Sequence, residues 1–114
     1  MKAATLTLAS ADKQLQLFMA DRWWLRLRGL LGRPPLTLGQ AMLIDPCHSV
    51  HTIGMRYPID VVYLDKNYRV LKVVECLAPY KFSACKGASY TIELSAGAAC
   101  RYQITSGDIM QWSV

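Results

Sequence analysis

The stretch PIDVVYLDKNYRVLKVVEC, residues 58–76, holds two apolar runs separated by a short segment of mixed character. Both runs are rich in the β-branched and aromatic residues that favour strands. Asn67 lies between the runs and tolerates the positive φ that a tight turn requires. The stretch therefore predicts a β-hairpin, and this hairpin sets the class of the fold.

Further short apolar or alternating segments surround the hairpin in the sequence. They predict strands at residues 4–10, 14–20, 41–46, 89–94 and 106–113. Residues 21–35 change to a helical period, and residues 95–102 predict a helical turn capped by Ser95. We therefore expect a mostly-β fold with α+β character only at its margins: a β-sandwich or barrel of about six or seven short strands with one or two short helices.

The composition is that of a globular protein with a basic balance. The chain has 114 residues, of which 53% are apolar and 18% are charged, and this favours a single globular domain over residues 1–114. The formal net charge is +5, and Arg22, Arg26 and Arg33 lie close together in the sequence. Such a basic face is typical of nucleic-acid binding, but no nucleic-acid-binding motif accompanies it, so we do not expect a nucleic-acid partner.

The sequence also bears on the location of the protein. It has no run of about 18 apolar residues, so we expect no transmembrane segment. The N-terminal MKAATLTLASAD resembles a secretory signal peptide only weakly, because its apolar stretch is short and interrupted by threonines. We therefore expect a cytoplasmic protein whose four cysteines are reduced and mostly buried.

Residues 46–60, PCHSVHTIGMRYPID, contain several side chains that can act in catalysis or bind a ligand. Cys47, His48 and His51 do not have the spacing of a standard metal site, and residues three apart on a strand point to opposite faces. We therefore expect no bound metal and no cofactor. Cys47 beside His48 is not by itself a catalytic pair, because such pairs usually form between separate parts of a fold.

Asp60 is the most informative residue of this stretch, since it stands among apolar residues on a predicted strand. There it shares a face with Val62 and Leu64. A carboxylate in a core is destabilising unless it is paired and hydrogen-bonded. The candidate partners are Arg56, Arg28, a histidine and the backbone amides of the preceding turn. The paired carboxylate is either structural or the floor of a ligand pocket in which an arginine binds an anion.

Three motifs give the chain a resemblance to a known family: RLRGLLGR, then AMLIDPCHSVHTIGMRYPIDVVYLD, then ELSAG followed by SGD. Over residues 14–113 the sequence resembles the bacterial and archaeal domain-of-unknown-function family 192. The resemblance implies a compact single-domain β-structure of two sheets with short helices. It implies no particular activity, because the family is named for the absence of an assigned one.

These observations favour a non-catalytic accessory module that binds a small ligand or a protein partner. The expected ligand-binding residues are Arg28, His51, Thr52, Arg56 and Asp60. One alternative is a small hydrolase-like enzyme with a nucleophile, a base and an orienting residue supplied by Cys47, His51 and Asp60. A second alternative is nucleic-acid binding through the face made by Arg22, Arg26 and Arg33.

Overall fold

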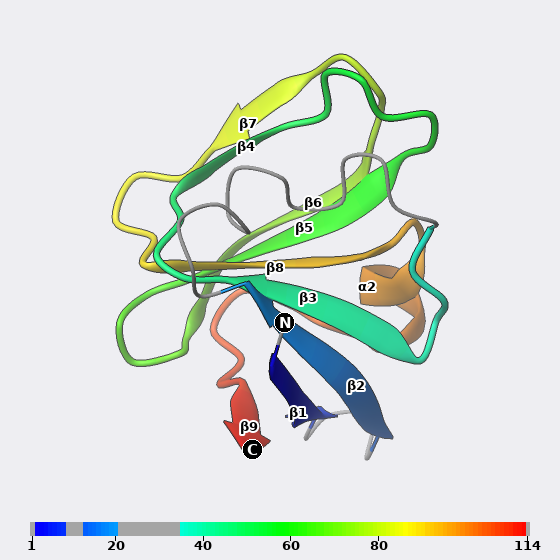
Figure 1. Ribbon diagram of the computed structural model, residues 1–114. Helices are drawn as coiled ribbons and strands as arrows, with labels where there is room; N and C mark the ends of the chain where they lie inside the picture. The colour runs from blue at the N-terminus through cyan, green and yellow to red at the C-terminus, as the bar shows by residue number, and fades with distance from the viewer. Residues whose placement is uncertain (1, 9–12, 21–34, 114) are drawn as a thin grey trace.

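The computed structural model describes residues 2–8, 13–20 and 35–113. These residues form a seven-stranded sheet, a separate two-stranded ribbon and one short helix (Figure 1). The elements in chain order are β1 (Lys2–Leu8), β2 (Lys13–Ala20), β3 (Gln40–Ile44), β4 (Ser49–His51), β5 (Ile59–Leu64), β6 (Val70–Leu77), β7 (Phe82–Ala84), β8 (Tyr90–Ser95), α2 (Ala98–Arg101) and β9 (Gln111–Ser113).

The large sheet has the strand order β6-β5-β8-β3-β2-β1-β9, and β4 pairs with β7 in the ribbon. Strands β2 and β3 run parallel, whereas the other paired neighbours of the described strands are antiparallel. An isolated bridge between Arg69 and Ile109 connects the segments that precede β6 and β9. Because β6 and β9 do not themselves pair, the sheet is not a closed barrel. The mostly-β prediction is confirmed.

Strand β5 is buried along its whole length because both faces of the sheet are covered there. Val62 and Leu64 belong to a core that includes residues of β1, β2, β8 and α2. Val61 and Tyr63 point the other way, into a second core that contains Val50 of the ribbon. The apolar run that predicted the hairpin thus fills both cores. The alternation also places Asp60 on the α2 side of the sheet, with Val62 and Leu64.

The described strands number nine rather than six or seven because β4 and β7 were not predicted. Each has three residues, too few for a periodic pattern. The β5–β6 turn also differs from expectation, since Tyr68 rather than Asn67 has the positive φ, at 67°. The Asp65 carboxylate stabilises this turn by accepting hydrogen bonds from the N–H groups of Asn67 (2.8 Å) and Arg69 (3.0 Å).

Helix α2 is present, but the prediction that Ser95 caps it is wrong. Its N-cap is Gly97, which has φ of 90° and provides no side-chain acceptor. The N–H of Ala99 in the first turn donates instead to Oδ2 of Asp60, at 2.8 Å. A carboxylate from β5 therefore accepts a hydrogen bond from one of the free N–H groups at this helix end through a tertiary contact.

Part of the sequence lies outside the described residues. The predicted helix, with Arg22, Arg26, Arg28 and Arg33, falls almost wholly within residues 21–34. Within the described ranges, no helix has the length and apolarity needed to cross a membrane.

Candidate functional site

The β4–β7 ribbon covers one face of the sheet and presents its other face to solvent (Figure 1). Val50 and Ser83 oppose each other and are buried, whereas the next pair, His51 and Phe82, is exposed. The hydroxyl of Tyr63 on β5 donates to Oγ of Ser83 at 2.9 Å and so connects the sheet to the ribbon. Burial raises the pKa of Tyr63 above its ordinary value.

Thr52 follows β4 directly and is fully buried. Its hydroxyl donates to the carbonyl of Ala78 at 2.6 Å and accepts from the N–H of Lys81 at 2.8 Å. Its backbone N–H donates to the carbonyl of Lys81, and its carbonyl accepts from the N–H groups of Tyr80 and Met55. Thr52, which we expected to contact a ligand, therefore fastens the loop at residues 52–58 to the loop at residues 78–81.

Large apolar side chains project from these two loops and the adjoining strand end. The exposed fractions are 58% for Ile53, 68% for Tyr80 and 71% for Phe82, the highest among the exposed large hydrophobic residues of the described chain. The same segments also expose His51, Arg56 and Lys81. We call this group the ribbon tip; its residues are His51, Ile53, Arg56, Tyr80, Lys81 and Phe82.

The backbone at Tyr80 adds a second observation. Its φ is 62°, in the left-handed region that Gly and Asn tolerate best. A bulky residue there costs about 1 kcal/mol or more. Because 68% of Tyr80 is exposed, packing does little to offset this cost. Neither the backbone nor the core accounts for a tyrosine at this position, which favours a role at the surface.

The two segments that form the ribbon and its loops carry charge of one sign. Residues 46–58 and 78–89 contain Arg56, Lys81 and Lys86 but no Asp or Glu. All three of these cationic residues are exposed. The surface therefore combines exposed apolar groups with positive charge. The charge is visible in the sequence, but no local sequence pattern marks Ile53, Tyr80 and Phe82 as parts of one surface.

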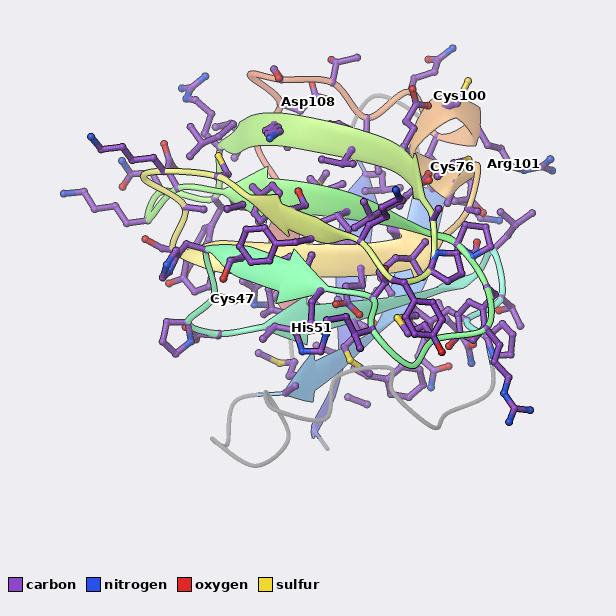
Figure 2. The ribbon with its side chains drawn as sticks, turned by 90° about the horizontal axis from the view of Figure 1, so that it is seen from above. Cys47, His51, Cys76, Cys100, Arg101 and Asp108 are labelled. Carbon is purple, nitrogen blue, oxygen red and sulfur yellow. The ribbon has the colours of Figure 1, made fainter. Side chains whose placement is uncertain are left out.

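The predicted catalytic residues do not converge. Cys47 is partly buried and its Sγ donates to the carbonyl of Ser49 at 3.0 Å, whereas His51 is exposed at the other end of β4 (Figure 2). Asp60 points to the opposite side of the sheet from the ribbon, toward α2. The described residues contain no cluster of three or more His, Cys, Asp or Glu that is placed to hold a metal ion.

Asp60 is fully buried and is held by backbone amides. Its Oδ1 accepts from the N–H of Cys76 and its Oδ2 from the N–H of Ala99, both at 2.8 Å. The pairing of β5 with β6 shifts between Ile59 and Val61, and Cys76 has φ of 52° at this irregularity. The carboxylate therefore joins a β-bulge to the start of α2. Of the predicted partners, backbone amides are present, although they come from β6 and α2 rather than from the preceding turn.

The five expected ligand-binding residues have different positions. His51 and Arg56 belong to the exposed ribbon tip. Thr52 is buried beneath it and hydrogen-bonds its two loops together. Asp60 lies on the far side of the sheet, and Arg28 lies outside the described residues. The four cysteines are unpaired, but they are less buried than expected: Cys76 and Cys100 are exposed and the other two are partly buried.

Glu93 is a buried acid that we did not single out from the sequence. It lies at the centre of β8, only 5% of it is exposed, and its Oε2 has no hydrogen-bond partner among the described residues. Burial raises its pKa to about 7. Burial, and secondarily the charge of Glu93, raises the pKa of Tyr57 as well. In the sequence, such a buried acid can be recognised because it stands between two apolar strand residues, here Ile92 and Leu94.

Comparison with known families identifies the chain. Residues 4–112 match DUF192, a family described as "Uncharacterized ACR". The chain belongs to the DUF192 family. The resemblance noted in the sequence is thereby confirmed, and the match begins nearer the N-terminus than residue 14. A comparison with curated proteins gave no significant match.

Two crystal structures resemble this DUF192 chain over 96% of its length. One is a protein of unknown function from Novosphingobium aromaticivorans, with 21% identity and a TM-score of 0.84 over 84% of that chain. The other, from Sinorhizobium meliloti, is described as a "putative transcription regulator" and has 19% identity and a TM-score of 0.83 over 91% of its chain. At these identities the likeness shows a shared fold.

Proposed function

We propose that this DUF192 chain is a non-catalytic binding module that engages its partner through the ribbon tip. The observation that carries the proposal is the exposure of Ile53 and Tyr80 on loops that Thr52 holds in place, together with Phe82 at the adjoining end of β7. Exposed apolar patches commonly mark interaction surfaces. Loops fixed in advance also lose less conformational entropy when they bind.

The arrangement of the other candidate residues supports binding over catalysis. A hydrolase with a Cys47 nucleophile needs a base and an orienting carboxylate within hydrogen-bond reach. The sheet lies between the side chains of Asp60 and His51, and both Asp60 oxygens accept from backbone amides. We also place the module in the cytoplasm, because unpaired cysteines are typical of reducing compartments.

Fractionation of cell extracts tests the proposal and does not require the partner to be identified first. The full chain is expressed with Ile53→Ser and Phe82→Ser together, and the matched control is Ile109→Ser, since Ile109 is 42% exposed and lies beyond the ribbon. We expect the wild type and the control to migrate with a larger particle or complex, and the double variant to migrate alone. Similar melting temperatures confirm that all three are folded. A wild type that migrates alone, or a double variant that migrates like the wild type, contradicts the proposal.

A further inference from the structure

The size of the ribbon tip limits the kind of partner it fits. A stable protein–protein interface takes about 800 Å² and about 20–30 residues from each partner. The ribbon tip offers Ile53, Tyr80 and Phe82 as its large apolar side chains, at the ends of two short loops. The ribbon tip as defined has six residues, fewer than the number that a stable protein complex takes from each partner. The ribbon tip suits a partner into which a few side chains can insert and whose surface does not need a complementary shape.

The geometry of the ribbon tip favours projection into such a partner. His51 and Phe82 form a cross-strand pair on the face of the ribbon turned away from the sheet. The loops at residues 52–58 and 78–81 continue from this end of the ribbon, at the side of the molecule opposite to β9 (Figure 1). The residues therefore extend from one end of the protein.

The chemistry of the ribbon tip fits the interface of an anionic bilayer. Aromatic and branched aliphatic side chains favour the boundary between headgroups and acyl chains. Lys81 and Arg56 are exposed on the same loops, where they can lie against lipid phosphates. The segments that form this end of the ribbon have no carboxylate to oppose a negative surface. A cytoplasmic leaflet presents such a surface.

We propose that the ribbon tip docks on the anionic headgroup layer of a phospholipid bilayer. Phe82, Tyr80 and Ile53 enter the layer, and the cations of Lys81 and Arg56 contact the phosphates. This proposal rests on the proposed binding function and names the partner of the same surface. Thr52 has a positioning role, since it fixes the two loops relative to each other.

Co-sedimentation of the full chain with vesicles tests the lipid assignment. The vesicles consist of phosphatidylcholine alone, or of phosphatidylcholine mixed with phosphatidylglycerol. We expect the wild type to bind the mixed vesicles and to be released at about 0.5 M salt, because screening weakens the contacts with phosphates. We expect Phe82→Ser to lower the partition coefficient about tenfold or more, and Lys81→Gln to lower it about fivefold. The control Ile109→Ser should bind like the wild type.

The outcomes separate the lipid assignment from the binding function. A wild type that stays in the supernatant with both kinds of vesicle overturns the lipid assignment, as do equal losses in Phe82→Ser and Ile109→Ser. If fractionation of extracts still depends on Ile53 and Phe82 in that case, the partner is a protein or a nucleic acid and the binding function stands. If neither experiment depends on the ribbon tip, both proposals fail.

Discussion

Replacement of Glu93 by glutamine should stabilise the protein at alkaline pH and make its stability less dependent on pH. The buried carboxyl has a pKa of about 7, against 4.5 for the ordinary side chain, and burial is the cause. One pKa unit corresponds to about 1.4 kcal/mol, so the ionised carboxylate destabilises the folded state by about 3 kcal/mol. Glutamine has a similar shape and no charge.

The sign of the effect follows from the raised pKa. The folded state binds the proton more tightly than the unfolded state, so the contribution of Glu93 to stability is present below pH 4.5 and is lost as the pH rises to about 7. We expect Glu93→Gln and the wild type to have similar stability near the acid end of this range. Above it, the variant should be more stable by about 3 kcal/mol.

Urea unfolding at about pH 5 and about pH 8 measures this difference. The advantage of Glu93→Gln over the wild type should grow by about 2 to 3 kcal/mol between the two conditions. Glu75→Gln is the matched control, because Glu75 is exposed on β6 and its replacement should change little. An advantage that does not change with pH, or a variant less stable than the wild type at pH 8, would refute the reasoning.

Three further predictions concern the contacts that hold the site. Asp60→Ala removes the acceptor of the Cys76 and Ala99 amides and should cost about 3 kcal/mol, or about 10 °C in thermal melting; an unchanged melting temperature would count against a structural carboxylate. Thr52→Val should lower the free energy of unfolding in urea by about 1–3 kcal/mol and weaken vesicle binding. Thr52→Ser, which keeps the hydroxyl, should retain most of the stability and of the vesicle binding. Equal behaviour of the two variants would show that the hydroxyl does not hold the loops. Tyr63→Phe should cost about 1 kcal/mol, measured in the same way, and a neutral result would show that the bond to Ser83 contributes nothing.

The sequence was informative where a residue's surroundings follow from its immediate neighbours. The apolar run of residues 59–64 predicted a strand, and the chain needs that run because β5 fills cores on both faces of the sheet. Asp60 within the run predicted a buried, hydrogen-bonded carboxylate because an unpaired one is too costly in a core. Its burial and its two backbone hydrogen bonds agree with that reasoning.

The ribbon tip was not predictable in the same way because it is formed by tertiary contacts. Thr52 bonds to Ala78 and Lys81, which are 26 and 29 residues away in the chain. Strands β4 and β7 are too short to have a period, so no local pattern shows that Ile53 and Phe82 meet at one surface. The absence of acidic residues from these segments was visible, but its meaning depends on which segments become neighbours.

Asp60 and Glu93 show why the same local pattern leads to different environments. Each is an acid between apolar residues on a central strand. Asp60 meets the amides of a β-bulge and of a helix end, whereas Oε2 of Glu93 meets no donor among the described residues. Because the partners of a strand residue come from other elements, burial can be inferred from the strand but hydrogen-bonding cannot.

Site-specific photo-cross-linking in living cells tests most directly whether the ribbon tip is the binding surface. The photoreactive residue p-benzoylphenylalanine is placed at Phe82 in one variant and at Ile109 in the other, two exposed apolar positions on different parts of the fold. Mass spectrometry then identifies the adducts. We predict adducts at position 82 with lipid, and a much lower yield at position 109. An equal yield at both positions, or none at position 82, would contradict the assignment of the ribbon tip as the binding surface.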